Sequence, residues 1–398
     1  ALSVILKYWK DSYDWRKREQ KLNSFSHFKT RIEGLDIHFM RSSPPAGTTK
    51  IVRPLLMLHG WPGSFVEFYD IIPLLTKPRH DSDVVFDVIC PSLPGYGFSD
   101  GATKPGMNPL AMSQVFVKLM KRLGYEEFYA HGGDWGAVTI TDMAVAFPYN
   151  LLGIHITTVF ANTPGATAKM FLGSILPSGY IMEAKFEPYW YPLSNFYGMI
   201  LREMGYLHLH ATKPDTVGVA LNSSPQGLAA YILEKFSTWT NLENIDKKDG
   251  GLLDPDFPIR LDSILDNICI YWFSSSITTS MRLYAEFFDP SGPSYTLKNI
   301  PVKVATGIAS FSNDLVVTPK NFAAYKYKNI VTFSTPPRGG HFAAMEEPEL
   351  VADDIHHFVN KNERLRPNES QQAKDKTGAQ KKEPSKAGPT KQKPAKKA

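Results

Sequence analysis

A carboxylate stands at the centre of the glycine-rich pentapeptide Gly-Gly-Asp-Trp-Gly at residues 132–136, where Asp134 is the central residue. We expect a strand over residues 127–131 before it and a helix over residues 137–147 after it. Small residues at such a junction form a nucleophile elbow, a strained turn that raises its central side chain above the sheet edge. Alone the pentapeptide is weak support, because glycine-rich turns with a capping Asp are common. The Gly-x-Gly-x-x-Gly spacing of dinucleotide-binding turns is absent.

Two further residues follow Asp134 in the order that an elbow enzyme needs, an acid and then a histidine. His341 lies in the sequence Gly-Gly-His-Phe-Ala at residues 339–343, after a predicted strand and loop. Asp314 lies just beyond a predicted strand at residues 302–305 and before His341 in the chain. We therefore predict that Asp134, Asp314 and His341 act together.

A carboxylate nucleophile implies a specific chemistry. Asp134 is ionised at pH 7 and can attack an sp³ carbon without a base, forming an alkyl ester. His341 would then activate a water that attacks the ester carbonyl, and Asp314 would orient the imidazole. The oxyanion that develops needs N–H donors, and we expect them from the backbone of Trp135 and Trp61. These residues predict a two-step hydrolase.

The elements that must position these residues read as an α/β fold. Continuous apolar runs that are separated by helical patterns predict a mostly parallel sheet with helices on both faces. These runs lie at residues 54–58, 84–90, 127–131, 152–157, 302–305 and 330–333, and a hairpin is expected over residues 28–39. Residues 160–295 break the rhythm with a helical, aromatic-rich pattern. We predict a core of residues 1–159 and 296–360, and a helical cap of residues 160–295 over the crevice at the sheet's carboxyl edge.

Composition excludes several classes of protein. Only two cysteines, Cys90 and Cys269, are present among 398 residues, too few for a disulfide framework or a four-thiolate zinc site. Residues 361–398 hold twelve Lys and Arg against four Asp and Glu, so the rest of the chain is net negative and no nucleic-acid-binding body is expected. This lysine-rich tail is predicted to be disordered, as a solubilising extension or a contact for an anionic surface.

No run of about 18 apolar residues occurs, so we expect no membrane-spanning helix in this chain. The sequence begins at Ala1 without Met, which leaves open whether an anchor precedes it.

Several motifs together resemble the microsomal epoxide hydrolase family of the α/β-hydrolase fold, which includes the insect juvenile hormone epoxide hydrolases. The resemblance covers essentially residues 1–360. The motifs are His-Gly-Trp-Pro-Gly-Ser at 59–64, Pro-Gly-Tyr-Gly-Phe-Ser at 94–99, the elbow at 132–136, Thr-Lys-Pro-Asp-Thr at 212–216, the run from Ala229 to Trp239, and 339–343.

The resemblance implies that Asp134 opens an epoxide and that His341 with Asp314 hydrolyses the ester. It also implies that two cap tyrosines, Tyr206 and Tyr284, hydrogen-bond the epoxide oxygen and donate a proton. It implies a hydrophobic epoxide and water as reactants, no cofactor and no metal, and a place at the endoplasmic reticulum membrane. One departure is Asp314, because the mammalian microsomal enzymes usually carry Glu there; we expect this to alter the rate.

Alternatives remain beside this interpretation. Haloalkane dehalogenases share the fold and the Asp nucleophile, but they usually carry Asn where this chain has Trp61. A serine esterase is disfavoured because no Gly-x-Ser-x-Gly frame occupies the elbow. His208 and His210 lack a third ligand at metal-binding spacing. A non-catalytic carrier of apolar ligands and an enzyme specific for juvenile hormone are the remaining alternatives.

Overall fold

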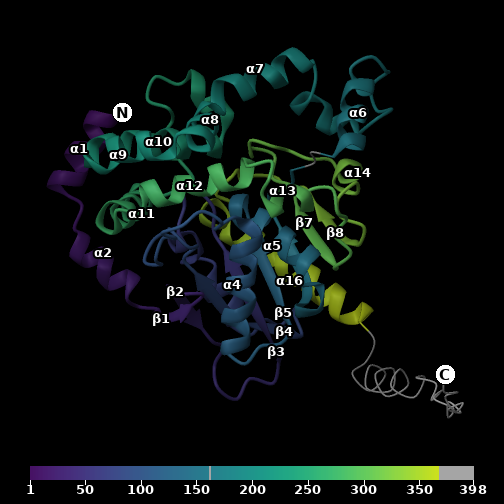
Figure 1. Cartoon of the computed structure of the whole chain (residues 1–398), viewed down its shortest axis with the longest axis horizontal. Coiled ribbons are helices and arrows are strands. Elements are labelled where there is room, and N and C mark those ends of the chain that lie inside the picture. Colours follow the sequence, from purple (N-terminus) through teal and green to yellow (C-terminus); the bar gives the residue numbers. More distant parts are fainter. Residues whose placement is uncertain (161–162, 367–398) are drawn as a thin grey trace, which may run out of the picture.

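A single mixed sheet organises the molecule. The computed structural model describes residues 1–160 and 163–366, and its eight strands follow the order β1-β2-β4-β3-β5-β6-β7-β8 (Figure 1). The first two strands are antiparallel to their neighbours and all others pair in parallel. The strands are β1 (Ser26–Ile32), β2 (Leu35–Ser42), β3 (Ile51–Leu58), β4 (Val84–Pro91), β5 (Phe128–Gly132), β6 (Leu151–Ile156), β7 (Thr306–Ala309) and β8 (Ile330–Ser334).

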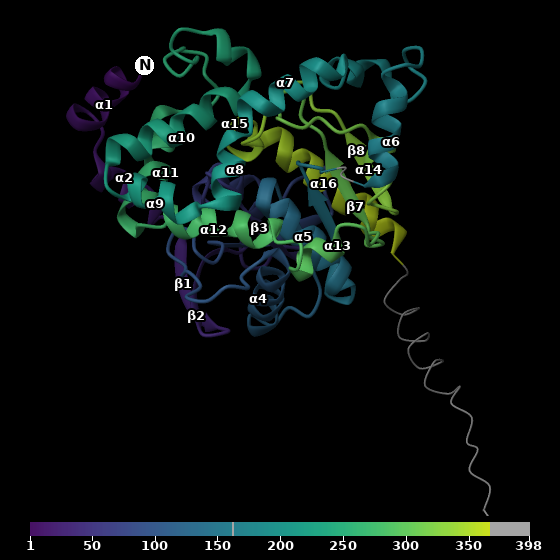
Figure 2. The same ribbon diagram turned by 45° about the horizontal axis from the view of Figure 1, so that its top comes forward.

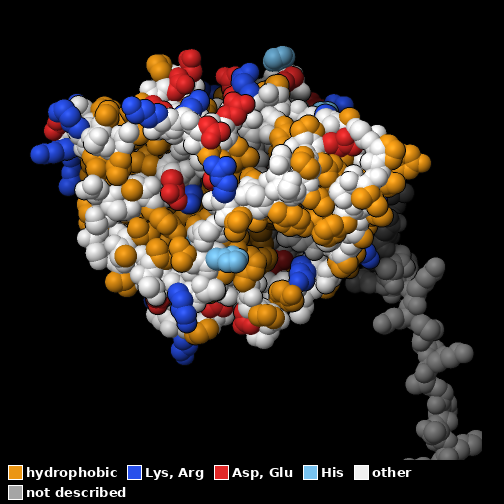
Figure 3. Space-filling model, turned by 90° about the horizontal axis from the view of Figure 1, so that it is seen from above, with side chains coloured by type: hydrophobic (Ala, Val, Ile, Leu, Met, Phe, Trp, Pro, Cys, Tyr) orange, Lys and Arg blue, Asp and Glu red, His pale blue; other side chains and the backbone are white. Residues whose placement is uncertain are grey.

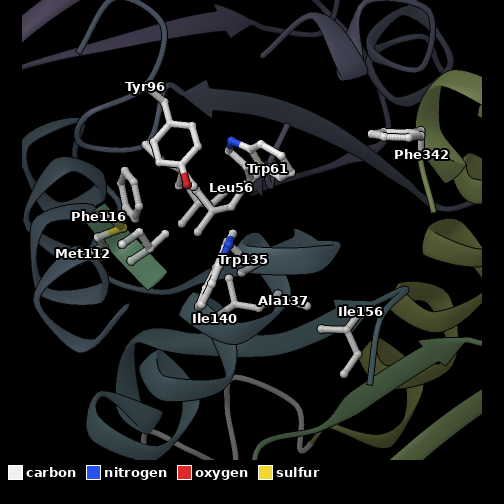
Figure 4. Close-up of a cluster of buried hydrophobic side chains, with 14 of the residues drawn as sticks. Leu56, Trp61, Tyr96, Met112, Phe116, Trp135, Ala137, Ile140, Ile156 and Phe342 are labelled. Atoms are coloured by element: carbon white, nitrogen blue, oxygen red, sulfur yellow. The ribbon is translucent and has the colours of Figure 1, made fainter. Parts of the chain in front are cut away.

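Helices cover both faces of the sheet, which is why its central strands are apolar throughout. Every residue of β4 and β5 is buried. Met112 of α4 (Pro109–Arg122) and Ile140 of α5 (Asp134–Ala146) belong to one apolar cluster. Leu75 of α3 (Ile72–Thr76) and Phe358 of α16 (Pro348–Leu365) belong to a second. The first cluster also holds Trp135 of the elbow and Trp61 beside it, and Figure 4 labels both side chains.

The helices of the core and the N-terminal segment have the following bounds: α1 (Leu2–Asp11), α2 (Trp15–Leu22), η1 (Phe65–Phe68), α3 (Ile72–Thr76), α4 (Pro109–Arg122), α5 (Asp134–Ala146), η2 (Pro148–Asn150), α14 (Lys320–Ala323), α15 (Ala343–Glu346) and α16 (Pro348–Leu365). Between β6 and β7 lie α6 (Pro164–Gly173), η3 (Ala184–Tyr189), α7 (Leu193–Glu203), α8 (Gly205–Thr212), α9 (Pro214–Asn222), α10 (Pro225–Thr240), η4 (Leu242–Asp246), α11 (Leu261–Ser274), α12 (Ile277–Phe288) and α13 (Pro293–Leu297).

The segment between β6 and β7 contains ten helices and none of the eight strands among its described residues, and it lies above the sheet in Figure 2. Its helices pack on one another, α12 against α8 and α9, and α10 against α11. The N-terminal segment binds it from the side, since Tyr13 and Arg18 both hydrogen-bond the carboxylate of Asp266 on α11. We propose that residues 160–295 form a cap on the core; residues 161–162 of this range lie outside the described part.

Most predicted strands lie where the apolar runs place them, and the hairpin turns at Glu33 and Gly34, which both adopt the positive φ that a two-residue turn requires. One strand was misplaced. Residues 302–305 form only a single bridge through Val302, and the strand that pairs with β6 begins at Thr306. Gly307 interrupts the apolar pattern of this strand, so the sequence does not predict it. Glycine is needed there because a Cβ would collide with the ring of Phe358.

The C-terminal helix is longer than expected. Helix α16 extends to Leu365, so the predicted start of the tail at residue 361 was wrong by several residues. Asn362 donates hydrogen bonds to the Leu152 carbonyl and the Tyr129 hydroxyl, and Glu363 accepts from Arg53, so these contacts extend the helix. The rest of the predicted disordered tail, residues 367–398, lies outside the described residues. Among the helices described, none is long and apolar enough to cross a membrane.

Candidate active site

The turn between β5 and α5 raises Asp134 above the sheet. Asp134 has a φ of +46°, a left-handed conformation that costs a non-glycine residue on the order of 1 kcal/mol or more. Gly136 is required for this turn, because a Cβ there would lie 2.0 Å from the carbonyl oxygen of Leu58. The backbone N–H of Asp134 donates to the hydroxyl of Thr158 at 3.2 Å. Helix α5 begins at Asp134 itself, three residues earlier than expected, so the carboxylate lies in the first turn of the helix.

Backbone donors meet the carboxylate where the sequence predicts them. The N–H of Trp61 donates to Oδ1 of Asp134 at 2.8 Å, and the N–H of Trp135 also bonds this side chain. Burial raises the pKa of Asp134 above its usual value, while His341 and the two N–H groups oppose that rise. The same two donors are placed to stabilise an oxyanion on this carboxyl carbon after it is esterified.

His341 and Asp314 complete a connected set with Asp134. Nδ1 of His341 lies 2.7 Å from Oδ1 of Asp314, and its Nε2 lies 3.6 Å from Oδ2 of Asp134. Nε2 has no hydrogen-bond partner among the described residues, although it is buried. Burial by itself lowers the pKa of His341, but Asp314 and then Asp134 raise it to about 9.

The second carboxylate of this set is held by its own donors. The N–H of Leu315 donates to Oδ1 of Asp314 at 2.7 Å, and the hydroxyl of Thr158 donates to Oδ2 at 3.2 Å. Thr158 thus bonds both to the backbone of the elbow and to the acid behind His341. Asp314 is 4% exposed, so its charge acts on the imidazole with little screening by water.

The two cap tyrosines are buried beside the tryptophans that flank the elbow. Tyr206 on α8 stacks on Trp61 with ring centroids 5.1 Å apart, and Tyr284 on α12 meets Trp135 edge-on at 4.7 Å. Their own rings lie 5.8 Å apart. Burial raises the pKa of both phenols well above 10, so they remain protonated at neutral pH.

All five of these side chains, Asp134, Asp314, His341, Tyr206 and Tyr284, line one cavity of about 490 Å³. The remaining lining is mostly apolar and comes largely from α6, α7, α8 and α12, and Figure 3 shows hydrophobic side chains gathered on the face seen from above. Examples of this apolar lining are Val138, Met170, Trp190, Phe196, Met199, Ile200, Leu207, Phe287 and Phe288. A cavity of this size and character takes a small hydrophobic molecule.

Nothing in the described residues offers a metal site. No group of three or more His, Cys, Asp or Glu side chains there could hold an ion. His210 is buried, with Nε2 3.0 Å from the hydroxyl of Tyr231, and burial lowers its pKa to about 3. His210 is therefore a neutral packing residue of the cap.

Several residues around the site carry no sequence signal that would have singled them out. Thr158 follows β6, and only its place at a strand's carboxyl end hints at a role. Glu67 fills the space beside Gly63, and burial followed by the nearby charge of Asp134 raises its pKa to about 8. Glu346 accepts hydrogen bonds from the N–H groups on either side of His341, those of Gly340 and Phe342. It fixes the backbone of the loop that presents the imidazole.

Comparisons with known proteins identify the family of this chain. Residues 1–68 match the family described as epoxide hydrolase N terminus, and residues 53–180 match the alpha/beta hydrolase fold. The chain is 47% identical to juvenile hormone epoxide hydrolase 1 of Ctenocephalides felis, over 91% of this chain and 77% of that protein. It is 46% identical to epoxide hydrolase 1 of Sus scrofa, over 90% of this chain and 79% of that protein.

A solved structure extends the likeness to three dimensions. The juvenile hormone epoxide hydrolase of the silkworm Bombyx mori superimposes with a TM-score of 0.88 at 43% identity, covering 92% of this chain and 85% of that one. The Aspergillus niger epoxide hydrolase does so with a TM-score of 0.73 at 30% identity, covering 90% of this chain and 84% of that one. With its α/β-hydrolase fold and these relatives, the chain belongs to the epoxide hydrolase family.

Proposed function

We propose that this enzyme converts hydrophobic epoxides to vicinal diols through a covalent ester on Asp134. The observation that carries the proposal is the shared cavity, in which a strained, N–H-bonded carboxylate and two protonated phenols line the same apolar space. Arene, alkene and lipid epoxides all fit this description. Relatives named juvenile hormone epoxide hydrolases make a terpenoid epoxide a narrower alternative within the same chemistry.

In the first step, a carboxylate oxygen of Asp134 attacks an epoxide carbon and forms a C–O bond. The ring C–O bond breaks, and its electron pair moves to the epoxide oxygen. That oxygen takes the phenolic proton of Tyr206 or Tyr284, because an alkoxide is a poor leaving group. The products are a hydroxy ester on Asp134 and one tyrosinate, so the negative charge has moved from the carboxylate to the phenol.

In the second step, the role of His341 depends on the charge of Asp134. Esterification removes the negative charge that lies 3.6 Å from Nε2, so the pKa of His341 falls from about 9. The imidazolium then releases its proton to solvent, which leaves a neutral imidazole that can accept a proton. It deprotonates a water, whose oxygen adds to the ester carbonyl. The N–H groups of Trp61 and Trp135 hold the oxyanion.

The intermediate then collapses and the charges return to their starting places. The bond between the carbonyl carbon and the alkyl oxygen breaks, and that oxygen takes the proton from His341 to complete the diol. The carboxylic acid left on Asp134 gives its proton back to the tyrosinate, and the restored carboxylate raises the pKa of His341 again, so the imidazole regains a proton from solvent. The sum is one epoxide and one water consumed for one diol.

The proposal also covers the location and the physiological role of the enzyme. The resemblance of the motifs to the microsomal family is the ground for proposing a role in the detoxification of xenobiotic and aromatic epoxides, and two mammalian relatives are named epoxide hydrolase 1. The resemblance of the motifs supports association with the endoplasmic reticulum or microsomal membrane. Contact of the lysine-rich tail with anionic lipid remains a prediction, tested by salt-sensitive vesicle binding with and without residues 367–398.

One observation favours haloalkane dehalogenase chemistry as a second candidate. The indole Nε1 of Trp61 is buried without a hydrogen-bond partner in the described structure, and such an N–H donor suits a halide ion. The two activities separate in one assay. The purified enzyme receives styrene oxide in one sample and 1,2-dibromoethane in another, and diol and bromide are measured. Diol without bromide supports the proposal, whereas bromide without diol overturns it.

A further inference from the structure

A buried lysine lies in the aromatic wall behind one of the two tyrosines. The side chain of Lys235, on α10, is only 8% exposed, although lysine is among the residues least often buried. Its Nζ lies 4.8 Å from the ring centroid of Tyr206, 5.4 Å from that of Tyr231 and 5.9 Å from that of Trp239. Its carboxylate partner is Glu234, whose side chain is 57% exposed. The ammonium therefore has aromatic rings on its buried side and a solvated carboxylate at the surface.

This cation distinguishes the two tyrosines from each other. Tyr206 contacts Lys235 and also stacks on Trp61. Tyr284 has only neutral aromatic neighbours among its ring contacts in the described structure, namely Trp61, Trp135, Tyr206 and His210. His210 adds no positive charge there, because burial and Lys235 lower its pKa to about 3. Burial and then the negative charges of Asp134 and Asp314 raise the pKa of Tyr206, and the ammonium of Lys235 lies against the same ring.

We propose that Lys235 is a positioning residue that makes Tyr206 the proton donor, by stabilising the tyrosinate formed as the epoxide opens. The inference rests on the proposed function. Negative charge on a phenolate spreads into its ring, so a cation against that ring interacts more strongly with the tyrosinate than with the neutral phenol. An interaction that strengthens as the reaction proceeds lowers the barrier, whereas equal binding of both states does not.

The step conserves atoms and charge. The proton leaves the hydroxyl of Tyr206 for the epoxide oxygen as the carboxylate of Asp134 forms the ester, and the negative charge passes to the phenol next to Lys235. Tyr284 keeps its proton and donates a hydrogen bond to the same oxygen. When the ester is hydrolysed, the proton of the Asp134 carboxylic acid returns to Tyr206.

The test separates the alkylation step from the hydrolysis step. Wild type, Lys235→Met and Lys235→Arg are mixed in excess over styrene oxide, and the rates of ester formation and ester decay are measured in single-turnover experiments. We expect Met to slow ester formation about 5- to 30-fold, the size of a desolvated cation–π contact, and to leave ester decay within about 2-fold. Arg should recover most of the formation rate because it keeps the charge.

Matched controls keep the result specific. Lys298→Met removes another lysine placed over a tyrosine ring, that of Tyr295 at 3.3 Å, and is expected to change neither rate. Lys235→Gln replaces the Met variant if that variant does not fold. In a Tyr206→Phe background the Met substitution should cause no further loss, whereas in a Tyr284→Phe background it should cause its full loss.

Three outcomes overturn the inference while the proposed function stands. These are equal slowing of both steps, failure of Arg to recover the rate, and loss of the effect in the Tyr284→Phe background instead. Failure of the proposed function is seen separately, in the wild type itself, if styrene oxide forms no ester on Asp134.

Discussion

The two sides of the cavity hold their functional groups in different ways. On the sheet side, Asp134 and Asp314 each bond to backbone N–H groups, and Asp314 in turn holds His341. On the cap side, Tyr206 and Tyr284 are held by ring packing against Trp61 and Trp135. The sheet side is a network of charges with fixed donors, whereas the cap side presents neutral acids in an apolar wall.

This difference predicts which reaction step each side controls. Groups bonded to backbone N–H atoms keep their geometry when a substrate enters, which suits a nucleophile and a water-activating base. Each phenol O–H, in contrast, can rotate about its C–O bond and so point at the oxygens of epoxides that differ in shape. We expect sheet-side substitutions to act on ester hydrolysis or on the nucleophile, and cap-side substitutions to act on ring opening.

The largest expected effect comes from removing both phenols. The Tyr206→Phe/Tyr284→Phe double variant should slow ester formation about 10²- to 10⁴-fold, because no acid remains to protonate the leaving oxygen. Stopped-flow fluorescence of the tryptophans beside the site measures this rate. Tyr197→Phe, which lines the same cavity with a partly exposed ring, is the matched control and should keep the wild-type rate. A double variant that forms the ester at the normal rate would remove the cap side from the chemistry.

The pH dependence of stability distinguishes the charged side from the neutral one. The pKa of His341 is about 9 in the folded protein, against about 6.5 in an unfolded chain. Its stabilising contribution is thus complete below about pH 6.5 and is lost as the pH rises through about 9. The free energy of unfolding of wild type relative to His341→Gln should therefore fall by about 1–3 kcal/mol over this range.

Urea denaturation of both proteins at a series of pH values measures this slope. The Tyr206→Phe/Tyr284→Phe variant should keep the wild-type slope, because burial holds both phenol pKa values well above this range. A constant difference between wild type and His341→Gln would show that the imidazole is neutral in the resting enzyme.

A smaller effect is expected at Thr158, which links the elbow to Asp314. Thr158→Val removes the donor to Asp314 and leaves the N–H of Asp134 without its acceptor, a loss of about 1 kcal/mol or about 5-fold in ester hydrolysis. Thr139→Val is the matched control, because the Thr139 hydroxyl is buried without a partner in the described structure. If both variants hydrolyse the ester at equal rates, Thr158 is only a packing residue.

The contrast between the two sides also explains what could be predicted from the sequence. The groups on the sheet side follow strands, Asp134 and His341 in glycine-rich turns and Asp314 in a loop. Residue type and chain order are therefore enough to indicate all three. The cap tyrosines carry no local pattern and were predicted only through the resemblance to a family. Lys235 was not singled out at all, because its position depends on packing between α8 and α10 that no periodicity encodes.

The fold shows the same division. Continuous apolar runs predicted the central strands, since burial on both faces leaves a direct trace in composition. The strand beginning at Thr306 was misplaced because a glycine in it packs against a helix, and residues 361–365 were assigned to the tail because their helix depends on contacts with Tyr129 and Leu152. In both places the secondary structure depends on long-range packing, which the local sequence does not reveal.

The central claim is the ester on Asp134, and one measurement tests it most directly. The His341→Gln variant is mixed with styrene oxide and its intact mass is recorded over time, followed by peptide digestion. We predict a stable adduct of one substrate mass, located on the peptide that contains Asp134, because ester formation proceeds while water activation is blocked. A folded variant that gains no mass, or gains it on another residue, would contradict the claim.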